Sequence, residues 1–251
     1  MTTCLSCEHI TKNYDGAPVV EDVNLELPEG GFISLLGPSG AGKTTLFNVL
    51  AGLDRPDGGR VFLGGEDITG VWGRTGYMPQ KDLLLEHRTV IDNVILPPLL
   101  RGEKKKNARK SAEAYFPAFG LSGCEKKYPY QLSGGMRQRA ALLRTCMTRN
   151  RVILLDEPFS ALDAITRRQM QDWYRGIAES MGLSTLFITH DVEEALLLSD
   201  TVYILGGAPG RITGAFEVQP RRPRDKDFPV SAEFGRQKKT LLEGIQVISD
   251  K

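Results

Sequence analysis

The sequence lacks the features that would place it across a membrane or on nucleic acid. No apolar run approaches the roughly eighteen residues of a spanning helix, because Ile91–Leu100 is short and contains Pro97-Pro98. No positively charged and apolar leader opens the chain. The formal net charge of +1 lacks the positive excess of a nucleic-acid-binding face, so we expect no nucleic acid among the partners.

Cysteine is scarce, and this scarcity argues against a metal or disulfide framework. Cys4 and Cys7, followed by His9, resemble half of a zinc site, but a structural site needs four ligands and no second close pair occurs. Reduced thiols of a cytosolic protein are the better interpretation. The 251 residues, 41% hydrophobic and 25% charged, suffice for one globular domain with a substantial core.

The most informative segment that is present is rich in glycine. Residues 37–45 fit the phosphate-binding pattern G-x-x-x-x-G-K-[ST]. The apolar run Phe32–Leu36 predicts a buried strand before it, and Thr45–Gly52 can form the following helix, so a plain glycine turn is rejected. The residues expected to contact nucleotide are Gly37, Pro38, Ser39, Gly40, Ala41, Gly42, Lys43, Thr44 and Thr45.

The chemistry of this loop explains its residue types. Backbone N–H groups of the glycines, at a helix N-terminus, are suited to phosphate oxygens. We expect Lys43 to neutralise the β- and γ-phosphate oxygens and the Thr44 hydroxyl to bind Mg²⁺.

A second acidic segment, Arg151–Glu157, has four consecutive apolar residues followed by Asp156 and Glu157. A buried strand that ends in acids delivers them to the edge where open parallel sheets bind ligands. Asp156 is expected to hold Mg²⁺, and Glu157 to polarise the attacking water as general base. An acidic turn alone would be common, but its pairing with the lysine of a phosphate loop favours the catalytic interpretation.

The segment Leu132–Gln138 reads Leu-Ser-Gly-Gly-Met-Arg-Gln and matches the signature sequence of the ATP-binding cassette (ABC) ATPases. The chain therefore resembles the ATP-binding subunit of an ABC transporter over about residues 5 to 215. The resemblance implies an α/β P-loop NTPase with the ABC ATPase fold: a RecA-like core sheet, a small antiparallel β subdomain and a helical signature subdomain. It also implies ATP and Mg²⁺ as cofactors.

Smaller motifs follow in the order of that family. Gln80 resembles the glutamine that links metal and water to the helical subdomain, which implies a role in both catalysis and Mg²⁺ binding. His190 resembles the switch histidine, and Tyr14 the aromatic residue that stacks on adenine. Singly, these could be a solvated amide, a structural histidine and a turn aromatic. The ends of the apolar runs before Gln80 and His190 favour a shared site.

The chain is expected to form a single ATP-binding cassette domain over residues 1–251. The nucleotide-binding core would span residues 1–87 and 151–218, the helical lobe 88–150 and a C-terminal extension 219–251. The predicted elements are strands at Leu5–Tyr14 and Val19–Leu27, a hairpin at Gly58–Gly65, helical structure from Thr89 to Gly120, a helix from Gly134 to Asn150 with Ser133 as N-cap, and a helix from Asp163 to Met181.

Only one copy of each motif is present, and this implies a dimer. In the family, the signature of one cassette closes over the ATP held by the other. Ser133, Gly134 and Gly135 would therefore contact the partner subunit's ATP, again through a helix N-terminus. Asp163, in Ser160-Ala161-Leu162-Asp163, would lie at the dimer seam and sense the opposite site.

The work of ATP binding must be delivered elsewhere, since the chain has no pore. We predict that Gln80 and Lys81–Val94 form a groove for a cytoplasmic helix of a transmembrane permease. The apolar Leu83-Leu84-Leu85 supports the groove, although these side chains could equally fill a core. The expected location is the cytoplasmic face of the cell membrane, as a peripheral subunit that also serves an extracellular solute-binding protein indirectly.

Two stretches resemble the importers of nitrate, sulfonate and taurine, a group that includes carriers of thiamine precursors: Met78–Leu85, and Pro209–Ile212 with Pro220–Arg224. After the leucines, Glu86 and His87 replace the group's usual proline and tryptophan. The tail from about residue 219 is interpreted as a short extension with solvated arginines, ending in a helix near Leu241–Ile248.

The functional interpretation is an ATP-hydrolysing subunit of an importer for a small solute. An ABC export ATPase shares every catalytic residue and stays an alternative. A soluble ABC ATPase acting on ribosome or DNA also remains, although such proteins usually carry two cassettes or a long coiled-coil insertion.

Overall fold

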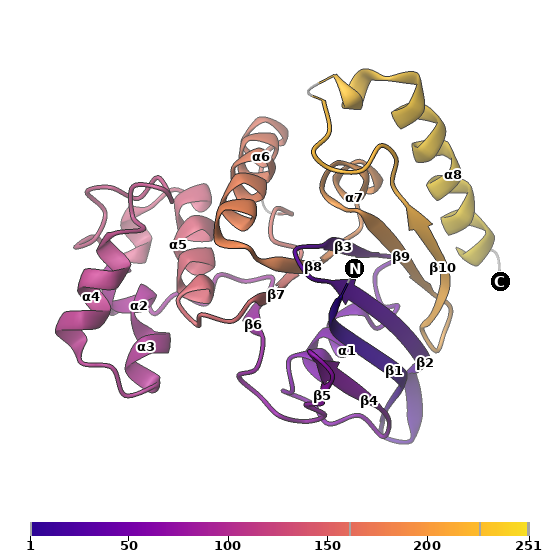
Figure 1. Cartoon of the computed structure of the whole chain (residues 1–251), viewed down its shortest axis with the longest axis horizontal. Helices are drawn as coiled ribbons and strands as arrows, with labels where there is room; N and C mark the ends of the chain where they lie inside the picture. Colours follow the sequence, from indigo (N-terminus) through magenta and orange to yellow (C-terminus); the bar gives the residue numbers. More distant parts are fainter. Residues whose placement is uncertain (1, 161, 226, 250–251) are drawn as a thin grey trace.

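The computed structural model describes residues 2–160, 162–225 and 227–249. Figure 1 shows a central sheet, a smaller sheet beneath it, a helical lobe on one side and a long C-terminal helix on the other. This α/β arrangement has the core sheet, the small antiparallel sheet and the helical lobe of the ABC ATPase fold expected above.

The central sheet has the strand order β10-β9-β3-β8-β7-β6. All neighbours pair in parallel except β10, which is antiparallel to β9. Strands β3, β7 and β8 are buried along their whole length, as apolar strands covered on both faces must be. The bounds are β3 (Phe32–Leu36), β6 (Gly76–Met78), β7 (Val152–Asp156), β8 (Ser184–Thr189), β9 (Thr201–Gly206) and β10 (Arg211–Glu217).

The smaller sheet is antiparallel, in the order β2-β1-β4-β5. Its strands are β1 (Thr3–Tyr14), β2 (Ala17–Pro28), β4 (Gly58–Leu63) and β5 (Glu66–Asp67). The two long strands and the hairpin predicted from the sequence are confirmed, with slightly wider bounds. Helix α1 (Lys43–Leu50) packs Leu46 and Phe47 into the core that both sheets share, so the phosphate loop before it is fixed between them.

The helical lobe contains α2 (Val90–Val94), α3 (Leu96–Leu100), α4 (Lys105–Glu113), the 3₁₀ turn η1 (Pro129–Gln131) and α5 (Gly134–Cys146). The helical pattern predicted from Thr89 onward is divided because Pro97 and Pro98 cannot donate backbone hydrogen bonds and Gly102 adopts a left-handed φ of 85°. The helix after Ser133 ends earlier than Asn150, while Ser133 is its N-cap, as predicted.

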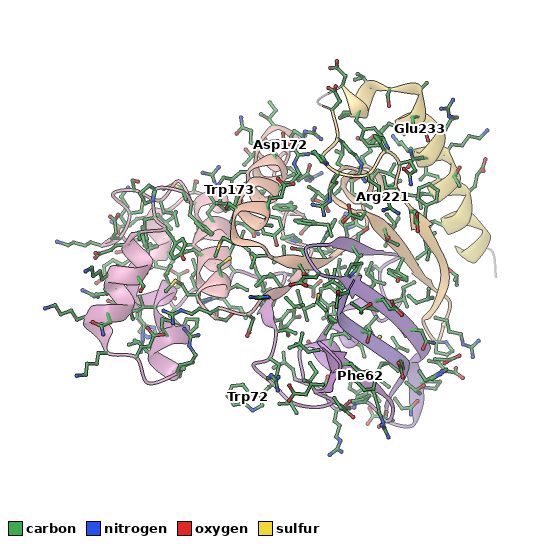
Figure 2. The ribbon with its side chains drawn as sticks, in the orientation of Figure 1. Phe62, Trp72, Asp172, Trp173, Arg221 and Glu233 are labelled. Carbon is green, nitrogen blue, oxygen red and sulfur yellow. The ribbon has the colours of Figure 1, made fainter. Side chains whose placement is uncertain are left out.

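Helix α6 (Ala164–Met181) joins the lobe to the central sheet. The Trp173 indole N–H donates to the Ala118 carbonyl over 2.8 Å, and the Arg139 guanidinium lies 5.2 Å from the Trp173 ring centroid. On the opposite side Tyr174 is buried against Phe32, edge to face. Figure 2 shows Trp173 projecting from α6 toward the lobe. Helix α7 (Val192–Leu198) follows β8.

The C-terminal extension corrects two sequence expectations. Its helix, α8 (Ala232–Ser249), preceded by the 3₁₀ turn η2 (Phe228–Val230), is longer than Leu241–Ile248 because the buried Phe234 continues the apolar face. The arginines of the basic segment are not all solvated. Arg222 lies 4.3 Å above the Phe32 ring and pairs with Asp200 at 2.6 Å, and Arg224 donates to the carbonyls of Ser199 and Pro220.

Backbone carbonyls hold this guanidinium, and its burial lowers the pKa of Arg224 to about 10. Within the described ranges, 2–160, 162–225 and 227–249, no helix is long and apolar enough to cross a bilayer.

The Arg222 contact gives a stability prediction. Arg222→Met should lower the free energy of unfolding by about 1–3 kcal/mol, because Asp200 loses a charge-assisted partner in a mostly buried setting. Chemical denaturation measures the loss. Arg221→Met is the matched control, since Arg221 is exposed. Equal stability of the two variants would show that the stacked arginine does not fasten the extension.

Candidate active site

The phosphate loop lies between β3 and α1, at the carboxyl edge of the central sheet. Gly40 and Gly42 have φ angles of 83° and 88°, a left-handed conformation that glycine adopts without steric cost. The Lys43 ammonium donates to the carbonyls of Gly37 and Pro38 at 2.9 and 2.7 Å. Partial burial lowers the pKa of Lys43, and the nearby carboxylates of Glu157 and Asp156 oppose that effect.

A contact from outside the loop holds it in place. The chain pairs at an isolated bridge between Val20 and Gly210, where the Gly210 N–H donates to the Val19 carbonyl. A Cβ atom at Gly210 would lie 2.1 Å from the Ala41 carbonyl oxygen, so only glycine permits this approach. Sequence reasoning used Pro209–Ile212 only as a subgroup motif and missed its contact with the phosphate loop.

The two acids stand where strand β7 ends. The Thr44 hydroxyl donates to Asp156 Oδ2 over 3.0 Å, which joins the loop to the sheet edge. Burial raises the pKa of Asp156, and the hydrogen bond from Thr44 and the charge of Lys43 partly offset it. A hydroxyl and a buried carboxylate side by side are oxygen donors of the kind Mg²⁺ prefers, so these residues fit the metal that the sequence implies.

Glu157 is the point at which three segments meet. Gln80 Nε2 donates to Glu157 Oε2 at 3.1 Å, while His190 Nδ1 lies 3.3 Å from Glu157 Oε1. The Glu157 backbone has a φ of 45°, a left-handed value that a non-glycine residue adopts at an energetic cost, and its N–H donates to the Ile188 carbonyl. The parallel pairing of β7 with β8 brings Glu157 and His190 to the same edge.

These groups line one cavity of about 590 Å³ at the sheet edge. Its walls are Val19, Ser39, Gly40, Gly42, Lys43, Thr44, Thr45, Gln80, Asp156, Glu157, Ile188 and His190. The structure thus brings together most of the residues that the sequence predicted. Val19 and Ile188 were missed, because an isolated apolar residue at a strand end carries no functional pattern.

Tyr14 lies beside this cavity rather than among its walls. Its hydroxyl donates to Asp54 Oδ2 at 2.7 Å, and this hydrogen bond raises the pKa of Tyr14. The Lys12 ammonium lies 5.2 Å from the ring centroid, and 41% of the residue is exposed. The Tyr14 ring is thus exposed, while its hydroxyl is held by Asp54. Stacking of this ring on adenine stays a prediction.

The signature residues are not walls of that cavity. Ser133 accepts the Met136 N–H as N-cap of α5, and Ser133 and Gly134 are exposed. Gly135 lies near Thr166 in the first turn of α6. Asp163 accepts the backbone N–H groups of Ile165 and Thr166, so its carboxylate caps α6 in this chain. Within the described residues, phosphate loop and signature therefore occupy separate places.

A glycine loop, a loop lysine and paired strand-end acids around one cavity at the edge of a parallel sheet define a P-loop nucleotide hydrolase. The family model described as ABC transporter matches residues 20–160. The chain belongs to the ABC transporter family, and it is an ATP-binding subunit with ATPase activity.

Two curated relatives illustrate the similarity. The formylaminopyrimidine import ATP-binding protein ThiZ of Halalkalibacterium halodurans is 38% identical over 245 residues, covering 97% of this chain and 95% of its own. The sulfate/thiosulfate import ATP-binding protein CysA of Neisseria meningitidis serogroup A is 38% identical over 229 residues. That alignment covers 88% of this chain and 64% of the relative.

Among solved structures, the dimeric cassette MJ0796, in a post-hydrolysis state bound to ADP and Pi, superposes with a TM-score of 0.75. It is 27% identical to this chain, and the superposition covers 86% of this chain and 99% of that one.

The close contact between Gly210 and Ala41 can be tested by a substitution that changes none of the residues lining the cavity. Gly210→Ala should displace the loop at Ala41 at a cost of about 1–3 kcal/mol, which weakens ATP binding about tenfold or more. Gly214→Ala is the control, because a Cβ there would make only an ordinary 3.8 Å contact. Calorimetric titration with ATP compares them, and equal affinities would contradict the proposed support of the loop.

Proposed function

We propose that this chain is the ATP-hydrolysing, energy-coupling subunit of an importer for a small solute. The observation that carries the proposal is the gathering of Gln80 and His190 on the two oxygens of Glu157, in the cavity that also contains the phosphate loop. The import function rests on the similarity of this chain to two import ATP-binding proteins, ThiZ and CysA.

We propose one task for each group of the cavity. Backbone N–H groups of the loop and the Lys43 ammonium bind the β- and γ-phosphates of ATP. Glu157 accepts a proton from the attacking water, and the Gln80 amide orients its carboxylate. His190 contacts the γ-phosphate from the other side of Glu157. Thr44, Asp156 and Gln80 would hold Mg²⁺, which supplies positive charge for the phosphates when bound.

The second half of each site comes from a second copy of the chain. Ser133 to Gly135 expose the start of α5, a helix N-terminus suited to phosphate, away from the walls of their own cavity. Each signature would close on the ATP of the partner, and Asp163 would lie at the seam. ATP favours the closed pair, whereas release of phosphate opens it, because only a difference in affinity can shift a conformational equilibrium.

We propose that the segment after Gln80 transmits this motion to the permease, because it is bonded to the signature helix. Arg144, on the signature helix, donates to the carbonyls of Asp82 and Leu83, and Arg137 pairs with the Asp82 carboxylate at 3.3 Å. Leu84 is 6% exposed and fills the core, whereas Leu83 is 58% exposed. Leu84 therefore has the core-filling role, and Leu83 is free to contact a partner. We propose Leu83 as the permease contact.

We further propose the division of the domain into a core of residues 1–87 and 151–218, a lobe of residues 88–150 and an extension from residue 219. The complex would be peripheral at the cytoplasmic face of the cell membrane, with transmembrane permease subunits and an extracellular solute-binding protein. Similarity to ThiZ, a formylaminopyrimidine import protein, supports a thiamine precursor as solute. Nitrate, sulfonate or taurine rests on the sequence motifs at Met78–Leu85 and Pro209–Ile212, and similarity to CysA, a sulfate/thiosulfate import protein, supports a small oxyanion.

Replacement of the general base separates binding from chemistry. Glu157→Gln should retain ATP binding, slow turnover at least about 100-fold and accumulate an ATP-bound dimer detectable by light scattering. Glu113→Gln, an exposed acid of α4, should behave as the unsubstituted chain. Rapid hydrolysis by Glu157→Gln would remove this residue from its assigned role.

Site-directed cross-linking tests the permease contact. In the assembled transporter, Leu83→Cys should form an adduct with a cysteine in a cytoplasmic loop of the permease, whereas Leu84→Cys should not, because that position is buried. Gel mobility and mass spectrometry identify the adduct. Absence of a Leu83 adduct in every nucleotide state would refute the contact.

A further inference from the structure

A cluster of polar groups joins the start of α6 to the turn that contains His190. Arg167, in the first turn of α6, donates from Nε to the Phe159 carbonyl at 3.3 Å and from Nη2 to the Leu162 carbonyl at 2.9 Å. Its third nitrogen lies 3.7 Å from Asp191 Oδ2. One guanidinium thus contacts both the segment that follows Glu157 and the residue that follows His190.

Asp191 is itself fixed in place. Its carboxylate accepts the N–H groups of Glu193 and Glu194 as N-cap of α7, and its own N–H donates to the Thr189 hydroxyl. The preceding residue, His190, contacts Glu157. A movement of Asp191 therefore displaces the imidazole relative to the general base.

A second contact lies one turn further along α6. Gln171 Nε2 donates to Glu194 Oε1 over 2.9 Å, and both side chains are buried. Burial raises the pKa of Glu194, and the positive charge of the neighbouring Arg167 partly offsets this rise. Helices α6 and α7 are thus joined by two polar pairs, and the first pair, Arg167 and Asp191, lines one small cavity together with Glu157 and His190.

We propose that Arg167 is a positioning residue that couples the dimer-facing segment ending at Asp163 to the orientation of His190. When a second copy contacts Asp163, the carbonyls of Phe159 and Leu162 move with that segment, and the guanidinium carries the displacement to Asp191. The imidazole then reaches its productive position against the γ-phosphate only in the closed pair. This role rests on the proposed function of the two-copy site.

The geometry also explains why the residue is arginine. Its planar guanidinium presents five donors in a fixed arrangement and can serve two carbonyls and a carboxylate at once. A lysine would keep the charge near Asp191 but could not hold this geometry. Arg168, the next residue, provides a contrast, because it is half-exposed and pairs with Asp172, an exposed residue of the same helix.

The test is a double-mutant cycle on the ATPase activity of the chain assembled with its permease. Arg167→Met and Asp191→Asn are measured singly and together; asparagine retains the helix cap while removing the charge. We expect each single variant to lower kcat about tenfold with KM for ATP changed less than about twofold, and the double variant to be no slower than the slower single one. Arg167→Lys should recover part of kcat, and Arg168→Met should match the unsubstituted chain.

Three results would overturn the role of Arg167. These are an unchanged kcat in Arg167→Met, a loss of kcat in the double variant equal to the product of the single losses, or a rise in KM at constant kcat. Asp191→Asn keeps the test valid if Arg167→Met fails to fold. An inactive unsubstituted complex would refute the proposed function together with this role, whereas an active unsubstituted complex with an equally active Arg167→Met refutes the role alone.

Discussion

The site depends on the placement of the Glu157 carboxylate between Gln80 and His190. Each of these three residues follows a different strand, β7, β6 and β8, and only the parallel pairing of those strands brings them to one edge. The left-handed backbone at Glu157 is sustained by that pairing, since its N–H bonds to the Ile188 carbonyl of the neighbouring strand. The pairing of the buried strands β7 and β8 therefore keeps Glu157, the proposed general base, in position.

Around this centre, arginines connect the segments that must move together. Arg144 attaches the loop after Gln80 to the signature helix, and Arg167 attaches the segment after Glu157 to the turn of His190. Both arginines donate to backbone carbonyls of the loop that they hold, and Arg167 reaches the turn of His190 through the Asp191 carboxylate. Arg222 connects the C-terminal extension to the core through the Asp200 carboxylate and the face of the Phe32 ring. Through connections of this kind, we propose that ATP binding displaces segments that do not contact the nucleotide.

Much of this arrangement could be predicted from sequence, because its motifs are local. The phosphate loop, the acids that end β7 and the cap at Ser133 each lie within a short window with a defined pattern. The remaining features depend on contacts between distant segments. Gly210 against Ala41 and Arg222 on Phe32 have no local pattern. Leu83 is exposed and Leu84 is buried, and Leu83 has a left-handed φ of 45°. A run of identical residues in the sequence does not reveal this conformation.

We propose that each ATP is hydrolysed between two copies of the chain. The most direct measurement is the turnover per molecule at saturating ATP, across concentrations at which light scattering follows the change from one copy to two. We expect turnover to rise in proportion to the fraction of paired chains and to stay near zero for single copies. Full turnover by single copies would contradict it.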